Sequence, residues 1–318
     1  MATPTTPSCV LVTGANSGLG FDCARQLASI EGVEKILLAC RSEEKASAAK
    51  ERLEELTQKK LFDIVVMDVS DLASVRKALE TLTKETIIDG VILNAGGGGG
   101  PNPIGLTKDG VTNAMAVNML GHVLLVDELL RTNKLSGQAA TVVYSGSESA
   151  RGIPQMSLAP PKLASGSIDE FKSICDGTFF PEKDGKDPKL MGAFTKFVGA
   201  LWVSSMARKH PNVRFVTMSP GATKGTNVRR DLPWYKRFLV GMILNILSMK
   251  GKAHSLDVGA RRYIDALLDH RTYQTGVFYG SKDGLSGDVV DQSVFLDYFS
   301  NESFQDNASA AIHSYIKA

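Results

Sequence analysis

The sequence predicts an α/β protein in which a doubly wound parallel sheet of about seven strands carries helices on both faces. Three observations lead to this fold class. Short β-branched runs alternate with longer amphipathic stretches along the whole chain of 318 residues. A glycine-rich turn at residues 14–20 connects the first apolar run to the first amphipathic stretch. No apolar run reaches the ~18 residues that a membrane span requires.

Seven apolar runs have the length and composition of strands. They are residues 9–13, 35–39, 63–67, 90–93, 140–144, 213–218 and 276–279. Helices are expected between them, at residues 18–29, 43–57, 72–84, 112–130 and 191–208. Phe194, Phe197 and Leu201 recur in the last helix at spacings of three and four, which is typical of a buried stripe. This order, with right-handed crossovers, predicts a single nucleotide-binding domain over residues 1–318.

Three segments depart from the simple alternation. Residues 96–100 are five glycines closed by a proline, which predicts a flexible loop after the fourth strand. Residues 151–189 form a long insertion before the last helix, and such a length indicates either a functional loop or a helix of its own. Residues 232–249 are rich in aromatic and aliphatic side chains. We interpret them as a helical flap over an apolar substrate pocket, or alternatively as a surface that contacts a membrane.

Composition and charge exclude several classes of protein. Hydrophobic residues make up 43% of the chain and charged residues 22%, which argues against disordered, collagen-like and coiled-coil chains. The 36 basic and 34 acidic residues leave a net charge of +2, too small to indicate a nucleic-acid partner. His210, His254, His270 and His313 stand in no cluster with carboxylates, so we expect no metal site.

The cysteines and the N-terminal residues indicate the cellular compartment in which we expect the protein. The four cysteines have neither CxxC spacing nor the density of a disulfide scaffold, which predicts buried free thiols in a reducing compartment. They are Cys9, Cys23, Cys40 and Cys175. Residues 1–8 lack the apolar core of a secretory signal. We therefore expect a cytoplasmic location or the interior of an organelle, with no signal peptide or transmembrane segment.

The glycine-rich turn predicts a dinucleotide site. Glycines are needed there for a tight strand-to-helix turn, for close approach of a pyrophosphate, and for close packing of helix on strand. About 20 residues further on, an acidic side chain would bind the adenosine ribose and select NAD. Arg41 and Ser42 stand there instead and could bind a 2′-phosphate, so we expect NADP. The alternative is a solvated arginine that leads into the next helix.

Several further motifs now make the chain resemble the short-chain dehydrogenase/reductase family over essentially its whole length. They are Gly14-x-x-x-Gly18-x-Gly20, Asp68 after the third strand, Asn94-Ala95-Gly96, the segment from Asn118 to His122, the strand that ends in Ser145-Gly146-Ser147, and Ser219-Pro220-Gly221. The resemblance implies a Rossmann fold and hydride transfer between a nicotinamide and a carbonyl or carbinol carbon. It also implies a set of residues that contact NADP: Gly14, Asn16, Ser17, Gly18, Leu19, Gly20, Arg41, Ser42, Asp68, Val69, Asn94, Ala95, Gly96, Lys196, Pro220, Gly221 and Thr223.

The resemblance also implies three candidate catalytic residues and one missing partner. Ser147 would bind the substrate oxygen, Lys196 would hold the nicotinamide ribose, and Asn118 would help to hold a water that relays protons. The family's Tyr-x-x-x-Lys motif departs here, because Gly192 stands four residues before the lysine. Tyr144 is interpreted as a strand residue that points elsewhere, and His122 as a packed structural histidine.

Within the family, the chain is most similar to the light-dependent protochlorophyllide reductase and retinol dehydrogenase-like branch. The first hypothesis is an NADP(H)-dependent oxidoreductase, its activity impaired by Gly192, that acts on a carbonyl, alcohol or activated double bond of a small, mainly apolar molecule. The second is a non-catalytic NADP(H)-binding protein that acts as a sensor or scaffold. A third is a membrane-surface protein that uses residues 232–249. The oligomeric state is left open between monomer and homodimer.

Overall fold

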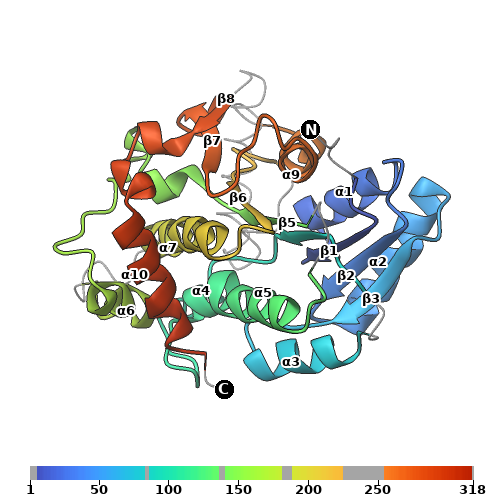
Figure 1. The fold of residues 1–318 in the computed structure, drawn as a ribbon, viewed down its shortest axis with the longest axis horizontal. Helices are drawn as coiled ribbons and strands as arrows, with labels where there is room; N and C mark the ends of the chain where they lie inside the picture. Colours follow the sequence, from blue (N-terminus) through green and yellow to red (C-terminus); the bar gives the residue numbers. More distant parts are fainter. Residues whose placement is uncertain (1–5, 83–85, 136–139, 181–187, 225–253, 317–318) are drawn as a thin grey trace.

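The sheet of the protein confirms the predicted fold class (Figure 1). A computed structural model describes residues 6–82, 86–135, 140–180, 188–224 and 254–316. Its strands are β1 Cys9–Thr13, β2 Lys35–Cys40, β3 Phe62–Val66, β4 Gly90–Leu93, β5 Thr141–Ser145, β6 Arg214–Met218, β7 Phe278–Asp283 and β8 Ser286–Asp291. They form an eight-stranded sheet in the order β3-β2-β1-β4-β5-β6-β7-β8, in which only the β7–β8 pair is antiparallel.

The chain order changes direction between β1 and β4. From β1 the chain moves outward to β2 and β3, and it then returns to the other side of β1 as β4. The crossovers on the two sides diverge at this point, which opens a crevice at the carboxyl ends of the strands. Val12 of β1 lies in register with Leu38 of β2 and Ile92 of β4, so the carboxyl ends of the three parallel strands meet at one edge. The architecture therefore places the glycine-rich turn in that crevice.

Helices cover both faces of the sheet, as the alternation predicted. One face packs against α1 Gly18–Leu27, α2 Glu43–Thr57 and α9 Leu256–Leu268. The other packs against α3 Leu72–Glu80, α4 Asn113–Met115, a π-helical turn at Ala116–Leu120, α5 Gly121–Arg131 and α7 Pro188–Lys209. An outer layer, α6 Ile168–Asp176 and α10 Glu302–His313, lies against α7 in Figure 1.

Helix α7 is the central helix of its face. Phe197, Leu201 and Trp202 are fully buried, as the apolar stripe predicted. By length and composition Leu190–Lys209 is apolar enough to cross a membrane, yet 83% of its apolar window is buried inside the molecule. The apolar character of α7 is therefore that of a core helix.

The long insertion contains a helix, one of the two alternatives left open by its length. Helix α6 begins after Ser167, whose hydroxyl accepts a hydrogen bond from the backbone N–H of Glu170 at 3.2 Å. The Glu170 carboxylate in turn accepts the N–H groups of Ala164, Ser165 and Gly166. These bonds satisfy backbone N–H groups at and just before the start of α6, which stabilises its first turn.

Other expectations match the structure only in part. The expected helix at residues 112–130 is present, as α4, the π-helical turn and α5 in unbroken succession. The last predicted strand begins at Phe278, two residues after Gly276, which has a φ of +79°. Strand β8 and helices α9 and α10 were not predicted. The expected flap at residues 232–249 lies outside the described residues.

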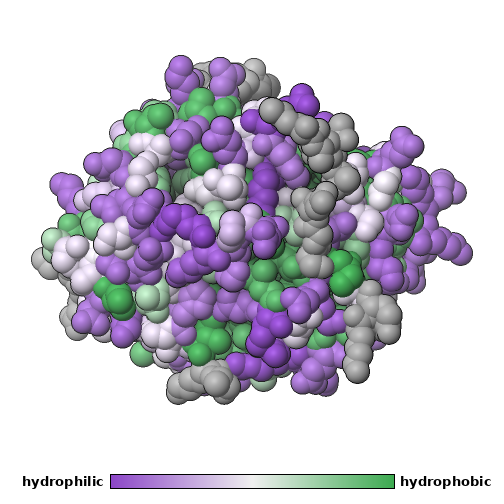
Figure 2. All heavy atoms as spheres, in the orientation of Figure 1, coloured by the Kyte–Doolittle hydropathy of each residue, from purple (hydrophilic) through white to green (hydrophobic). Residues whose placement is uncertain are grey.

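The surface is mixed in character. Figure 2 shows hydrophilic side chains over most of this face, with apolar side chains in small, separate groups. The four cysteines are free and buried, as the sequence predicted for the thiols themselves. Burial raises the thiol pKa of both Cys9 and Cys40 to about 11.

Candidate active site

The turn between β1 and α1 needs glycine at three positions, two because of backbone conformation and one because of close packing. Gly14 and Gly18 have φ values of +67° and +58°, the left-handed region that side chains disfavour. Gly14 also donates its N–H to the Ala39 carbonyl of β2 at 2.8 Å. Gly20 has ordinary backbone angles, but a Cβ there would collide with the Gly14 carbonyl and lie 2.6 Å from the Asn94 amide nitrogen. The helix therefore approaches the strand as closely as a dinucleotide turn requires.

The N-terminus of α1 is open toward the cleft. Its N-cap residue, Ser17, makes no side-chain capping hydrogen bond, whereas Ser42 caps α2 and Asp71 caps α3. The first N–H groups of α1 are thus available to a ligand, and the positive end of the helix dipole favours an anion. Ser17 and Gly18 line the cleft where these groups point. This arrangement suits a pyrophosphate.

Two cations flank the far end of the cleft. Arg41 lies just after β2 with 63% of its side chain exposed, and its guanidinium is 3.9 Å from the Asp68 carboxylate. Lys45, in the first turn of α2, lines the same cleft beside Arg41 and Ser42. Two cations side by side can hold the charge of a 2′-phosphate. Lys45 was not predicted, although its position three residues after the N-cap Ser42 places it at the same helix end.

The ends of β1 and β4 are tied together at the crevice. The Asn94 side-chain amide donates to the Thr13 carbonyl at 2.9 Å, and the Ala95 N–H donates to the Thr13 hydroxyl at 2.9 Å. Both Thr13 and its hydrogen-bond partners are largely removed from solvent. The predicted residues Asn94, Ala95 and Gly96 consequently form one wall of the cleft.

Asn118 lies in the π-helical turn, and its side chain is bonded to backbone groups. Its amide donates to the carbonyls of Gly97 and Ala114, each at 2.8 Å, and its oxygen accepts the Gly97 N–H at 3.3 Å. A Cβ at Gly96 would lie 2.5 Å from that oxygen. Asn118 therefore shapes the glycine loop after β4. π-Helical turns of this kind occur frequently at functional sites.

Lys196 is held close to the end of β5. Its ammonium donates to the Ser145 carbonyl at 2.7 Å and lies 4.9 Å from the centre of the Tyr144 ring. Burial lowers the pKa of Lys196 to about 8. Ser147, two residues further along, is the N-cap of a short helix, Glu148–Arg151, and its hydroxyl accepts hydrogen bonds from the N–H and hydroxyl of Ser149. Helix α7 packs against that short helix, which brings the segments of Ser147 and Lys196 together.

Tyr144 and His122 take no part in the cleft. Tyr144 is fully buried and donates its phenol to the Asn118 carbonyl at 3.3 Å, while burial raises its pKa. The ring lies against α7, where a Cβ at Gly199 would be 2.5 Å from the phenol oxygen. Burial first, and then the charge of Lys196, lowers the pKa of His122 to about 3. A neutral His122 between the Thr13 hydroxyl and the Asn118 carbonyl is a packed structural histidine.

Gly192 leaves open space at the position where the family motif has tyrosine. It lies on α7, one turn before Lys196, and a Cβ there would have no described atom within 4 Å. Residues four apart share a helix face, so a side chain at 192 would lie beside that of Lys196. Neither Tyr144 nor His122 fills this position.

The turn after β6 completes the carboxyl edge. Gly221 has a φ of +70°, and its N–H donates to the Ser219 hydroxyl at 3.1 Å. The Thr223 hydroxyl donates to the carbonyls of Pro220 and Gly221 at 3.2 and 3.3 Å. These bonds close a compact loop at the end of β6, beside the end of β5.

Most of the predicted cofactor residues line one cleft of about 250 Å³. They are Gly14, Asn16, Ser17, Gly18, Leu19, Arg41, Ser42, Asp68, Val69, Asn94, Ala95 and Gly96. Gly20 lies behind the loop, and the remaining four lie outside the lining of this cleft: Lys196, Pro220, Gly221 and Thr223. Sequence reasoning missed Ala39, Lys45, Met67 and Val117, which line it too. Within the described ranges, no three histidine, cysteine or acidic side chains are grouped to hold a metal ion.

Comparison with known proteins finds sequence similarity to short-chain dehydrogenases in the half of the chain that contains the cleft. Residues 8–158 match the family model for short chain dehydrogenases. The chain is 37% identical over 142 residues to the WW domain-containing oxidoreductase of Danio rerio, a match that covers 45% of this chain and 34% of that protein. It is 36% identical over 137 residues to human retinol dehydrogenase 13, covering 43% and 40% respectively. The matched region spans about a third of the length of the first of these relatives.

The fold likeness extends further along the chain. The structure of L-sorbose reductase from Gluconobacter frateurii, complexed with NADPH and L-sorbose, superposes with a TM-score of 0.63. That match covers 90% of this chain and 98% of the reductase, at 17% sequence identity. At this identity the likeness concerns the fold, and it includes the half of the chain beyond residue 158.

Proposed function

Because residues 8–158 match the family model for short chain dehydrogenases, we propose that the whole protein is an NADP(H)-dependent oxidoreductase of the short-chain dehydrogenase/reductase family. Its reaction is hydride transfer to or from a carbonyl, alcohol or activated double bond of a small, mainly apolar molecule. The observation that carries the proposal is the cleft at the crevice, with the open N-terminus of α1 in its centre and Arg41 and Lys45 at one end.

The residues present fit this cofactor. The loops that line the cleft pack closely because Gly14, Gly20 and Gly96 have no side chain, and a Cβ at each would lie 3.1, 2.4 and 2.5 Å from an atom of a neighbouring segment. The uncapped N–H groups after Ser17 are donors for a pyrophosphate, and Arg41 supplies charge for a 2′-phosphate. When bound, the cofactor supplies the hydride. The protein must then orient the substrate and deliver or remove a proton.

Lys196 is the ionisable group best placed for the proton. With a pKa of about 8, its ammonium is largely protonated at pH 7 and loses its proton more readily than an ordinary lysine. In the absence of a tyrosine at position 192, we propose that Lys196 or a water beside it supplies the proton in the reducing direction. A positioned general acid contributes ~10²–10⁴-fold in rate, and we expect the enzyme to be slow because the family's own acid, the tyrosine, is missing at position 192.

We also assign the chain to the retinol dehydrogenase-like side of the family. The support is the identity of 36% to human retinol dehydrogenase 13 over 137 residues. The likeness to protochlorophyllide reductases rests on the sequence motifs alone. The substrate proposal goes no further than a small molecule that is mainly apolar.

The second candidate function is a non-catalytic NADP(H)-binding protein. Gly192 favours it, because the usual proton donor is missing there while twelve of the predicted cofactor residues line the cleft. Both candidates require NADPH binding, and they differ in turnover.

One experiment separates the two candidates. NADPH binding is measured by titration of nicotinamide fluorescence, and turnover by loss of NADPH absorbance with a panel of aldehydes, ketones and quinones. Binding with NADPH consumption by at least one compound supports the oxidoreductase. Binding without consumption across the panel supports the sensor or scaffold, and absence of binding contradicts both.

A further inference from the structure

A buried carboxylate lies directly after Ser147. Glu148 is 1% exposed and begins the short helix Glu148–Arg151. Its two oxygens bind different elements: one accepts the Ser219 hydroxyl at 2.6 Å, and the other accepts the Ser281 N–H of β7 at 2.8 Å. Ser219 is 1% exposed and Ser281 is fully buried, so both bonds are shielded from water. Hydrogen bonds to a buried charge are among the strongest in proteins.

The bond to Ser219 continues into the turn after β6. The Ser219 hydroxyl has one hydrogen, which it donates to Glu148, and its lone pairs accept the Gly221 N–H at 3.1 Å. The order of donors is therefore fixed from Gly221 through Ser219 to Glu148. Each bond in such a chain polarises the next. The carboxylate thus holds the conformation of the turn, including the left-handed Gly221.

Two arginines complete the cluster around Glu148. Arg262 of α9 donates to the Ser281 hydroxyl at 2.8 Å and to the Ser219 carbonyl at 3.4 Å. Arg151 donates to the Ser281 carbonyl at 2.9 Å. Burial lowers the pKa of both guanidinium groups, and the negative charge of Glu148 opposes that shift. The carboxylate therefore has compensating cations, as a buried charge requires.

The position of this cluster suggests its function. The adenosine end of the cleft is marked by Arg41 after β2, and the pyrophosphate end by α1. An extended dinucleotide that continues along the carboxyl edge must next pass β4, β5 and β6. The Ser219–Gly221 turn is at the end of β6, and Ser147 follows β5. Glu148 is the residue that bonds these two segments together.

We propose that Glu148 is a positioning residue that fixes the Ser219–Gly221 turn against the Ser147 segment and so forms the seat for the nicotinamide half of the cofactor. The inference rests on the proposed NADP(H) binding. It assigns to Glu148 no contact with the substrate and no proton transfer. Its effect is confined to one half of the dinucleotide.

Replacement of Glu148 by glutamine breaks the chain of hydrogen bonds in either orientation of the amide. Glutamine offers one acceptor oxygen, whereas the site needs two. If the amide nitrogen faces Ser281, two N–H donors oppose each other. If it faces Ser219, that hydroxyl must accept from both the amide and Gly221, and its own hydrogen loses its partner. Ser219→Ala removes the middle of the same chain with a smaller change in the core.

The test compares two ligands that share the adenosine half. NADPH contains the nicotinamide, and adenosine 2′,5′-bisphosphate lacks it. For both Glu148→Gln and Ser219→Ala, we expect NADPH to bind at least ~10-fold more weakly than to the natural chain, with the affinity for the bisphosphate changed less than ~2-fold. Isothermal titration measures both, and it requires no turnover.

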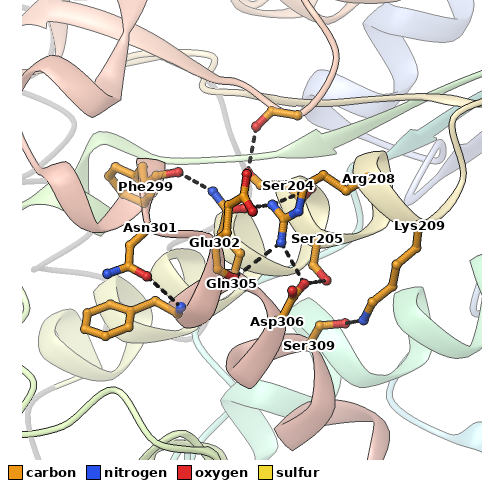
Figure 3. Close-up of polar contacts among 12 residues, drawn as sticks. Ser204, Ser205, Arg208, Lys209, Phe299, Asn301, Glu302, Gln305, Asp306 and Ser309 are labelled. Carbon is orange, nitrogen blue, oxygen red and sulfur yellow. Dashed lines mark hydrogen bonds and ion pairs between the residues drawn. The ribbon is translucent and has the colours of Figure 1, made fainter.

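A control variant comes from a polar network on the other side of α7 (Figure 3). Gln305 of α10 is buried, accepts a hydrogen bond from Arg208 and donates to the Phe299 carbonyl at 2.6 Å. Gln305→Leu should lower the melting temperature and leave both affinities unchanged. This variant therefore shows how a general loss of stability affects the affinities for the two ligands.

The outcomes are distinct. Equal weakening of both ligands in the Glu148 and Ser219 variants means that the carboxylate acts through the fold as a whole, which overturns the proposal. Unchanged NADPH affinity in both variants also overturns it. If Glu148→Gln does not fold, Ser219→Ala alone decides. If the natural chain binds neither ligand, the proposed function itself fails.

Discussion

Gly192 lies one helical turn before Lys196 on α7, and a Cβ at Gly192 would have no described atom within 4 Å. Lys196, predicted from the sequence to be the lysine of the Tyr-x-x-x-Lys motif, holds its ammonium 2.7 Å from the Ser145 carbonyl. Gly192 stands where that motif has tyrosine, and the described residues leave room there for a side chain. The site therefore keeps the position of a proton donor without the donor.

We predict that Gly192→Tyr raises turnover on a small carbonyl substrate by at least ~10-fold, the low side of the range for general acid–base catalysis. The phenol would lie on the same helix face as Lys196, whose charge lowers the phenol pKa. NADPH affinity should change little. Steady-state kinetics of both proteins with the same substrate measure the effect.

Gly192→Phe is the matched control, because it adds the same ring without the hydroxyl. Both variants replace a glycine inside a helix, so both should keep or slightly raise the melting temperature. An equal rise in turnover for both would assign the gain to packing. No gain for a folded, NADPH-binding tyrosine variant would mean that the proton follows another route.

We predict that the protein prefers NADPH to NADH by ~10- to 100-fold in affinity, since an arginine–phosphate hydrogen bond contributes on the order of 1.5–3 kcal/mol. Arg41→Ala should remove most of this preference, and Lys45→Ala a smaller part. Titration of each cofactor gives the ratio. Arg52→Ala is the control. Arg52 is an exposed arginine of α2, the helix that contains Lys45, and its guanidinium packs over the Phe21 ring, away from the cleft. A preference that survives the loss of both Arg41 and Lys45 would contradict this assignment.

We predict that the rate of carbonyl reduction falls as the pH rises through about 8, the value to which burial lowers the Lys196 pKa. Above that pH the side chain is neutral and has no proton to give. Single-turnover loss of NADPH absorbance between pH 6.5 and 9.5 follows the chemical step. Lys196→Arg should flatten the profile, because a guanidinium stays charged over this range. A flat profile in the natural chain would indicate that water supplies the proton.

We predict a pH-dependent contribution to stability from His313 of α10. Burial lowers its pKa, but the hydrogen bond and charge of Asp127, 3.2 Å away on α5, raise it more, so the net shift is upward. A raised histidine pKa stabilises the fold fully below the unfolded value of ~6.5, and the contribution is lost as the pH rises through the folded value. Asp127→Asn should therefore cost roughly 0.5–1 kcal/mol at pH 5.5 and almost nothing at pH 9.

Thermal melts of both proteins at the two pH values measure that difference. A cost that is the same at pH 5.5 and pH 9 would assign the effect to lost packing between α5 and α10. A larger cost at pH 9 would contradict the sign of the shift.

The central part of the fold was predictable because its strands are buried and its helices amphipathic. Strand β4 at Gly90–Leu93 and helix α2 at Glu43–Thr57 have the boundaries that their patterns predicted. Strand β8 was not predictable, since its sequence is polar and it pairs at the edge of the sheet. Helix α10 buries mainly small side chains such as Ala308 and Ala311, which give a weak apolar stripe.

The residues of the candidate site were likewise predictable from the sequence only in part. Residues of the glycine turn and Arg41 were predictable because each follows a strand at the carboxyl edge. Lys45 was missed although its local position, three residues after the N-cap Ser42, places it at the cleft. Glu148 was missed because its role depends on tertiary contacts with Ser219 and Ser281 far along the chain. No local pattern marks a buried carboxylate whose partners are 71 and 133 residues away.

The buried cysteines have a practical consequence. A thiol with a pKa of about 11 is almost entirely protonated at neutral pH, and a thiol inside the core is closed to reagents, so iodoacetamide can modify it only when the chain opens. Cys40 ends β2, where the Ala39 carbonyl holds Gly14. Its alkylation rate therefore reports how often the glycine turn separates from β2, and Cys175 in α6 reports the outer layer independently. The native cysteines are therefore intrinsic probes of local opening, and mass spectrometry can follow their alkylation without any introduced probe.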